Sequence, residues 1–358
     1  MKRNIEKLLE SKVPVIDRII EKYNPRNYDK NSLFFRLSPP RYEYNLEELN
    51  KGIAEPFWDF LDRGGKRWRP TFFLLVCEAL GKDPQKFLDF AIIPEVVHNG
   101  TLIIDDIEDS SEFRRGKPCI HKMYGIDIGT NLGNAMFYMP LLALIKNKDK
   151  LSTEKVSKIY EIYVEEMIKI SFGQAIDIVW HRGLVKFDKI LEEKYLQMCI
   201  YKTGTLARMA GKMAATLADG NNDQIDKIGR FAESIGLAFQ IQDDVLDLMS
   251  EEFSKQKGGF GKDITEGKIT LMVIHTLKKA ESVDKKRLTE IISLHTTDQK
   301  LRNEAIKIIT KYGSIEYVKE FAKSIVDESW QEVNKILPPS EAKENLRAFA
   351  NYLIERNI

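Results

Sequence analysis

The chain has 358 residues, 43% of them hydrophobic, so it is long enough to bury a large core in one big helical domain or in two ordinary ones. Its 55 basic and 54 acidic residues nearly cancel to a net charge of +1, which excludes a global field favouring nucleic acid or an anionic membrane as partner. The three cysteines are far apart and form no CxxC pair, which is typical of a reducing compartment without disulfides.

The N-terminal segment MKRNIEKLLESK mixes acids with bases and has no apolar core, so it is neither a secretory signal peptide nor a typical transit peptide. No apolar run approaches the ~20 residues that span a bilayer. We therefore expect a soluble cytoplasmic protein without a membrane span. Residues 1–45 carry the weakest pattern, and we expect a peripheral helix with an irregular arm there.

Helical periodicity dominates the rest of the chain. Between Glu154 and Phe172 the apolar residues follow the i, i+3, i+4, i+7 spacing of an amphipathic helix, with Ser152 or Thr153 as its cap. The same stripe extends from Val318 to Ile336, after a break at Gly313-Ser314 and before a second break at Pro338-Pro339. No alternating strand with a hairpin turn competes anywhere, and no break is long enough for a domain linker. The pattern predicts an all-α protein.

Two acidic clusters share the pattern DDxxD. They are Asp105-Asp106-Ile107-Glu108-Asp109 and Asp243-Asp244-Val245-Leu246-Asp247. On a helix the first and fifth positions share one face about 6 Å apart along the axis, so two carboxylates can share a cation. Each cluster follows an apolar run, which indicates a lined cavity rather than an acidic helix end, the plainer alternative for either cluster alone.

Crowded carboxylates need a compensating cation, and all the ligands here are hard oxygens without supporting His or Cys. Mg²⁺ fits because it binds one or two carboxylates and completes its shell with waters and substrate phosphates. An EF-hand is excluded because the Gly at loop position six and the closing Glu are missing.

Three sets of basic residues lie at breaks between helices, where they could meet phosphate groups. They are GGKRWRP at 64–70, Arg114-Arg115-Gly116, and Lys202 with Lys268, near which Lys257 and Lys262 also lie. Each set alone is more often a solvated surface, but their coincidence with the acidic clusters favours ligand binding. The glycine run before Lys262 lacks the P-loop spacing, which excludes a nucleotide loop of that type.

The sequence resembles the trans-isoprenyl diphosphate synthase family, and especially its geranylgeranyl diphosphate synthases. The resemblance covers nearly the whole chain after the N-terminal arm, through GGKRWRP, EVVHNGTLIIDDIEDSSEFRRGKPCIHKMYG, FGQAIDIVW, YKTGTLARMA, FQIQDDVLDL and GKDITEGKIT. It implies an all-α catalytic domain at 46–358, a single multi-helix bundle around a deep central cavity, in a homodimer. The implied reaction condenses isopentenyl diphosphate with an allylic diphosphate (dimethylallyl, geranyl or farnesyl), using three Mg²⁺ ions per site.

The resemblance also implies roles for individual residues. Asp105, Asp109 and Asp243 would bind the metal ions, with Asp106, Asp244, Asp247 and Asp263 around them. The allylic diphosphate would meet Arg114, Lys202, Lys268 and Gln240, whereas isopentenyl diphosphate would meet Lys66, Arg69, His98 and Arg115. A lone His on an apolar helix face is usually a core residue, but the resemblance favours a ligand role for His98. Thr203, Gln174 and Asp177 would be polar supports.

If the product grows down the cavity beneath the first acidic cluster, its tail meets the residues one turn before Asp105. Gly100 and Thr101 are small there, where farnesyl-length relatives tend to have an aromatic residue, so we expect a twenty-carbon product with Phe137 and Tyr138 at a deeper floor. A product of twenty-five carbons or more, or farnesyl diphosphate, remains the alternative. Terpene cyclases and head-to-head synthases need no isopentenyl diphosphate site, so the GGKRWRP run and Arg115 disfavour them. A non-catalytic regulatory subunit is disfavoured because both acidic motifs are intact, and a helical scaffold that merely binds Mg²⁺ is disfavoured further.

One position departs from the family pattern. Gly259 stands where some farnesyl-type relatives have a phosphate-binding Lys, and Lys257 is the residue that could replace it.

Overall fold

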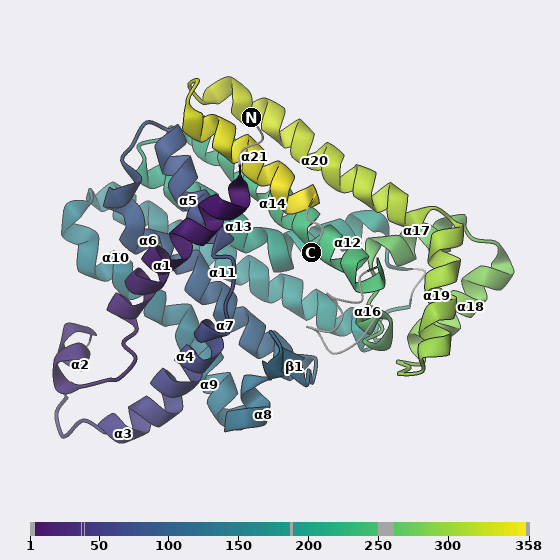
Figure 1. Cartoon of the computed structure of the whole chain (residues 1–358), viewed down its shortest axis with the longest axis horizontal. Coiled ribbons are helices and arrows are strands. Elements are labelled where there is room, and N and C mark those ends of the chain that lie inside the picture. The colour runs from purple at the N-terminus through teal and green to yellow at the C-terminus, as the bar shows by residue number, and fades with distance from the viewer. Residues whose placement is uncertain (1–3, 37, 39, 187–188, 250–260, 356–358) are drawn as a thin grey trace.

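The computed structural model describes residues 4–36, 38, 40–186, 189–249 and 261–355, in which helices dominate (Figure 1). The α-helices are α1 (Ile5–Tyr23), α2 (Lys30–Arg36), α3 (Leu46–Leu49), α4 (Glu55–Asp62), α5 (Trp68–Ala79), α6 (Leu88–Ala91), α7 (Ile93–Glu108), α8 (Ile120–Tyr124), α9 (Ile126–Tyr138), α10 (Leu142–Asn147), α11 (Thr153–His181), α12 (Glu192–Cys199), α13 (Thr205–Leu217), α14 (Asn222–Met249), α16 (Lys262–Thr265), α17 (Leu271–Lys279), α18 (Ser282–Ser293), α19 (Gln299–Lys311), α20 (Ser314–Ile336) and α21 (Glu341–Glu355). Shorter 3₁₀ and π elements are η1 (Asn50–Ala54), η2 (Pro84–Phe87), η3 (Met139–Leu141), η4 (Lys148–Lys150) and η6 (Ile200–Gly204). The predicted all-α fold class is confirmed.

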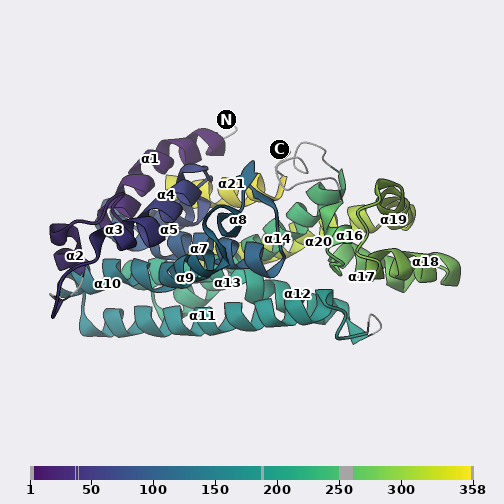
Figure 2. The ribbon, with the colours of Figure 1, turned by 90° about the horizontal axis from the view of Figure 1, so that it is seen from below.

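Helices α5 and α13 form the centre of the bundle because they are apolar on nearly every side. Almost every residue of both is buried, as expected for helices without a solvent face. Helices α7, α11 and α14 pack around α13, while α20 and α21 cover α14. Figure 2 shows α11 running along one edge of the molecule, with α13 beside it and α18 and α19 at one end.

The two helices predicted from periodicity are confirmed. Helix α11 begins after Ser152, whose side chain accepts a hydrogen bond from the backbone N–H of Lys155. Helix α20 begins after Gly313. The apolar stripe of α11 is only partly buried, because Val164 and Ile168 are 53% and 49% exposed.

The N-terminal helix α1 joins the main core. It buries Ile5, Leu9, Ile16 and Ile20 completely or nearly so, and it packs against α5, α6 and α21. A separate small cluster around Tyr28 holds the segment that follows. The division of the chain at residue 45 stays a prediction.

A short hairpin corrects the expectation that no strand pair occurs. Strands β1 (Phe113–Arg114) and β2 (Lys117–Pro118) pair antiparallel, with Arg114 opposite Lys117. The turn residues Arg115 and Gly116 have φ angles of 54° and 74°, the two positive values of a type I′ turn. Arms of two residues are too short to show alternation in the sequence.

Two segments are apolar and long enough to cross a membrane by length and composition, which corrects the expectation that none approaches this. They are Pro84–Glu108 and Ile126–Lys150, within which the most apolar windows of 18 residues have mean hydropathies of 1.4 and 1.3. In the fold each segment is divided among several short elements, and 61% of the apolar window of the first and 39% of that of the second is buried. The first ends in the acidic cluster at Asp105.

Candidate active site

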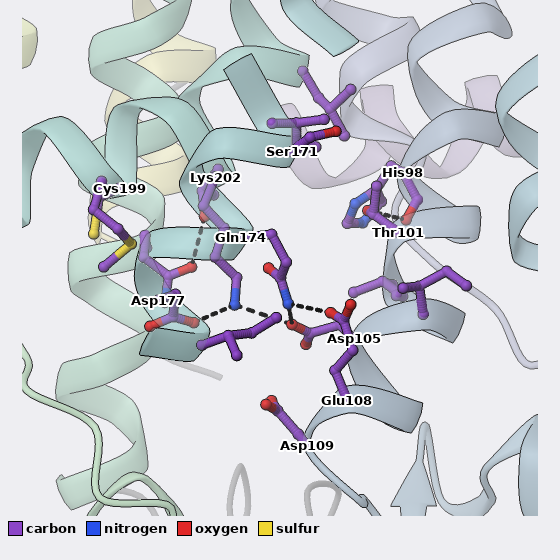
Figure 3. Close-up of a pocket in the computed structure, with 18 of the residues that line it drawn as sticks. His98, Thr101, Asp105, Glu108, Asp109, Ser171, Gln174, Asp177, Cys199 and Lys202 are labelled. Atoms are coloured by element: carbon purple, nitrogen blue, oxygen red, sulfur yellow. Dashed lines mark hydrogen bonds and ion pairs between the residues drawn. The ribbon is translucent and has the colours of Figure 1, made fainter. Parts of the chain in front are cut away.

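One cavity of about 840 Å³ opens beside α7, α11 and α14, and both acidic clusters contribute to its wall. Figure 3 shows Asp105 and Asp109 on α7, facing Gln174, Asp177 and Lys202 across the cavity. The remaining wall is mostly apolar and includes Leu102, Ile104, Phe137, Tyr163, Met167, Ile170, Leu206 and Phe239. The cavity therefore has a charged end and an apolar depth.

Asp105 is the centre of the charged end. Its carboxylate accepts hydrogen bonds from Lys202 Nζ at 3.0 Å and from Gln174 Nε2 at 3.1 Å (Figure 3). Lys202 Nζ also lies 2.5 Å from Asp177 Oδ2. Asp109, at the C-terminal end of α7, lies 3.8 Å from Lys268 Nζ. The two aspartates thus face separate lysines that come from distant parts of the chain.

The pKa values of Asp105 and Asp109 shift in opposite directions. Burial alone would raise the pKa of Asp105, but the ammonium groups of Lys202 and Lys268 outweigh it and hold the pKa well below its ordinary value. Burial, followed by the negative charge of Asp105, raises the pKa of Asp109 to about 7. A cation between the two carboxylates would relieve this repulsion, so the pair fits a divalent metal ion.

In the second acidic cluster, two of the three aspartates line the cavity and Asp247 does not. Asp243 and Asp244 line the cavity. Asp244 accepts hydrogen bonds at 2.8 Å from the hydroxyl of Tyr195 and from Nε2 of Gln240. Gln240 in turn accepts one from Thr203 Oγ1. The predicted neighbours Gln240 and Thr203 therefore hold this cluster in place as well as lining the site.

Two of the aspartates predicted to lie around the metal ions, Asp106 and Asp247, are not among the residues that line the cavity, and their role stays a prediction. Asp106 is buried and accepts from Nε of Arg114 at 2.8 Å. Asp247 is buried and accepts a hydrogen bond from the backbone N–H of Asp263 at 3.0 Å. Each of these two carboxylates is therefore directed to a partner within the protein.

The lysine Lys202 depends on an unusually close backbone approach. It lies on the π-helix η6, which packs against Gly173 of α11. A β-carbon at position 173 would lie 2.3 Å from the backbone nitrogen of Lys202, so only glycine allows this distance. Burial would lower the pKa of Lys202, but Asp105 and Asp177 outweigh it and raise the pKa. The lysine therefore stays charged.

Arg114 and Lys268 complete the cationic part of the wall. Burial would lower the pKa of Arg114, but Asp106 reverses this and raises it, so Asp106 keeps the guanidinium charged and oriented. Lys268 lies 2.5 Å from Glu266 and 3.6 Å from Asp263. The sequence prediction that these cations meet the acidic clusters is consistent with their position in one cavity.

Arg69 and His98 line the same cavity on the side of α5 and α7. Burial lowers the pKa of Arg69 to about 10, and among the described residues no acceptor lies within hydrogen-bond distance of its buried Nε. Burial and then the charges of Arg69 and Arg115 lower the pKa of His98 well below its ordinary value. A buried arginine with an open donor and a neutral histidine suit an anion.

Lys66 and Arg115 are not among the lining residues of this cavity. Lys66 is exposed and its Nζ lies 3.3 Å from the hydroxyl of Tyr352 in α21. Arg115 donates to Asn99 Oδ1 at 3.1 Å. The four residues predicted for isopentenyl diphosphate are therefore near one another in the fold, but only two of them face the cavity.

Of the four residues predicted to control product length, three line the cavity and one does not. Thr101, Phe137 and Tyr138 line the cavity. Gly100 does not, because it lies against α9, where an added β-carbon would be 2.8 Å from Cβ of Met136 and 3.0 Å from the carbonyl oxygen of Gly133. The expected contact of Gly100 with a product tail is thus replaced by helix packing.

Glu108, Tyr195 and Glu266 are among the lining residues to which the sequence analysis assigned no role. Glu108 accepts a 2.6 Å hydrogen bond from Gln174, and burial raises its pKa. Tyr195 lies seven residues before Lys202, a helical spacing that could have indicated a shared face. Glu266 lies two residues before Lys268. Lys257 and Gly259 lie outside the described residues.

Within the described part of the chain, no three His, Cys, Asp or Glu side chains are close enough to hold a metal ion among themselves. Several carboxylates nonetheless line one cavity, and carboxylate oxygens suit a hard cation that shares its shell with ligand oxygens.

The chain was compared with known proteins and protein families. Residues 50–309 match the family model Polyprenyl synthetase. A short chain isoprenyl diphosphate synthase from Methanothermobacter thermautotrophicus is 37% identical over 82% of this chain and 87% of that protein. A geranylgeranyl diphosphate synthase from Methanosarcina mazei is 31% identical over 83% of this chain and 87% of that protein. The crystal structure of geranylgeranyl pyrophosphate synthetase from Pyrococcus horikoshii Ot3 superposes with a TM-score of 0.82 at 29% identity, covering 98% of both chains.

The helical fold and the cavity with its acidic end place the protein among the all-α isoprenoid synthases. The chain belongs to the polyprenyl synthetase family, and it is an enzyme, a prenyltransferase that makes prenyl diphosphates.

Proposed function

We propose that this enzyme condenses isopentenyl diphosphate with an allylic diphosphate in a Mg²⁺-dependent reaction to give geranylgeranyl diphosphate. One observation carries the proposal: a single cavity of about 840 Å³ combines the carboxylates of both DDxxD clusters, several buried cations and an apolar wall. The charged end suits two diphosphates and the apolar depth suits a growing hydrocarbon chain.

The acidic residues are the metal ligands in this proposal. Asp105, Asp109, Asp243 and Asp244 would hold the ions together with diphosphate oxygens. Bound Mg²⁺ would supply positive charge that stabilises the departing diphosphate. Asp106 and Asp247 would act by holding Arg114 and the 261–263 segment in position.

The basic residues divide between the two diphosphates. Arg114, Lys202 and Lys268 would bind the allylic diphosphate, because their charges line the same end as the aspartates. Lys202 Nζ lies 3.0 Å from Asp105 Oδ1, so this cation can be shared between the aspartate and a diphosphate oxygen. Arg69 and His98, with Lys66 and Arg115 behind them, would bind isopentenyl diphosphate.

The apolar wall protects the reaction from water. An allylic cation must meet the double bond of isopentenyl diphosphate before it meets water, and fixed positioning of both diphosphates favours this. Thr101 is the lining residue one turn before Asp105, and its small side chain leaves the cavity open toward Phe137 and Tyr138. This arrangement supports a twenty-carbon product over farnesyl diphosphate.

An exposed apolar face supports a homodimer in this proposal. On α11, Val164, Ile168 and Phe172 are 53%, 49% and 58% exposed, and Tyr138 of α9 is 71% exposed. A second copy covering this face would also close the adjacent side of the cavity, because all four residues line it. Light-scattering mass measurement should give twice the chain mass, and Ile168→Lys should give monomers.

We further propose a cytoplasmic location with no membrane span.

The test is incubation of the purified enzyme with isopentenyl diphosphate, Mg²⁺ and each allylic primer in turn. Elongation to a twenty-carbon product supports the proposal, and Asp105→Asn should reduce turnover at least about a hundredfold. Cyclised products would contradict the proposed condensation, and a different chain length would contradict the twenty-carbon product. Full activity with excess chelator would contradict the dependence on Mg²⁺.

A further inference from the structure

The N-terminal segment is ion-paired to both sides of the loop at residues 63–66, which contains Lys66. Arg26, just after α1, makes a bidentate pair with Asp62 at the end of α4, with distances of 2.8 and 3.0 Å. Asp17 of α1 accepts a 2.7 Å hydrogen bond from Nε of Arg67, the residue after the loop. The loop therefore begins and ends beside residues that the N-terminal segment holds.

Arg67 is held in an unfavourable backbone conformation. Its φ is 46°, in the left-handed region that costs free energy for a residue with a β-carbon. Its side chain is 2% exposed and donates to four acceptors: the carboxylates of Asp17 and Glu95 and the carbonyl oxygens of Leu61 and Gly64. These contacts stabilise a conformation that the backbone alone would not favour.

A buried chain of hydrogen bonds continues from Arg67 to Arg115. Glu95 accepts from Arg67 at 3.4 Å, and Asn99 donates to the Glu95 carboxylate at 3.3 Å. Arg115 then donates to Asn99 at 3.1 Å. Glu95 and Asn99 are both almost completely buried, so solvent cannot replace their partners. This series of hydrogen bonds therefore connects Asp17 of α1, through Arg67, to Arg115 of the proposed isopentenyl diphosphate site.

The loop backbone packs against both arginines. A β-carbon at position 65 would lie 2.7 Å from Nη1 of Arg67 and 3.4 Å from Nη2 of Arg115. A movement of Arg67 must therefore be transmitted to the loop and to Arg115.

We propose that helix α1 is a positioning element for the isopentenyl diphosphate site, acting through Asp17 and Arg67 on Lys66 and Arg115. This inference rests on the proposed function of that site. It gives the N-terminal arm a role in substrate binding, although the family-model match begins only at residue 50.

The test is Asp17→Ala in the full-length enzyme. The KM for isopentenyl diphosphate should rise about tenfold, because a charge-assisted hydrogen bond to Arg67 is lost. The KM for the allylic primer and the kcat should stay within about twofold of wild type, and Asp17→Glu should restore most of the affinity. Amide hydrogen exchange over residues 61–67 should become faster in Asp17→Ala.

The matched control is Lys22→Ala, which removes a 2.7 Å ion pair between the same helix and Asp89 of α6. It should change neither the KM for isopentenyl diphosphate nor exchange in 61–67. Unchanged exchange in Asp17→Ala would overturn the inference, and so would an equal rise of KM for both substrates. If the wild type elongates no primer, the proposed function fails, while the exchange measurement still decides whether α1 holds the loop.

Discussion

Replacing Thr101 with Phe should shorten the product by one isoprene unit. Thr101 lines the cavity, and its hydroxyl donates to the carbonyl oxygen of His98 at 2.8 Å, which fixes the side chain on the wall of α7. A phenyl ring there would occupy the space of the last five carbons of a twenty-carbon chain. Burying each CH₂ contributes about 0.8 kcal/mol, so excluding five carbons costs about 4 kcal/mol. This corresponds to a roughly thousandfold preference against the last condensation.

The assay is chromatography of the dephosphorylated products after incubation with a dimethylallyl primer. We expect farnesol to replace geranylgeraniol, while the rate of the first condensation stays near that of wild type. Thr101→Ser is the matched control, because it keeps a small hydroxyl side chain and should leave the product unchanged. An unchanged twenty-carbon product from Thr101→Phe at the wild-type rate would refute the placement of the tail beside Thr101.

Three further predictions concern His98, Gly267 and Arg208. Burial and the Arg69 charge lower the pKa of His98 below 6.5, so only the unfolded chain takes up this proton and the free energy of unfolding falls as the pH drops from 7 to 5. His98→Gln should flatten this slope by up to about 1.4 kcal/mol per pH unit in urea titrations, and an unchanged slope would contradict the reasoning. Gly267→Ala should raise the KM for the allylic primer about tenfold, because Gly267 has a φ of 73° that strains a residue with a β-carbon, and relieving this strain would displace the adjacent Lys268. The new β-carbon would also lie 2.3 Å from Cε1 of the exposed His295, so adding His295→Ala should recover only a small part of the loss, and equal KM values in all variants would argue against the reasoning. Arg208 pairs with the fully buried Glu166, so Arg208→Met should lower the free energy of unfolding by about 3–5 kcal/mol. Adding Glu166→Leu should restore most of that stability, whereas an equal loss in single and double variants would show that the unpaired charge is not the cause.

The local pattern determined the helices and the types of chemical group at the site. Apolar spacing located α11 and α20, with the start of α20 one residue earlier than predicted, because a helix face repeats every 3.6 residues whatever surrounds it. The duplicated DDxxD pattern and the basic sets beside it indicated a site for metal ions and diphosphates. The hairpin at Arg115 was missed because two-residue strands carry no detectable period.

Tertiary packing decided which of those groups face the cavity. Asp106 and Asp247 share their motifs with Asp105 and Asp243, yet one is paired with Arg114 and the other with the backbone of Asp263. Arg67 lies in the same basic motif as Lys66 and Arg69, but its guanidinium is buried against Asp17, fifty residues earlier. Periodicity describes neighbours within one helix, whereas the partner of a buried charge comes from another element. Only the packed structure brings that element within hydrogen-bond distance.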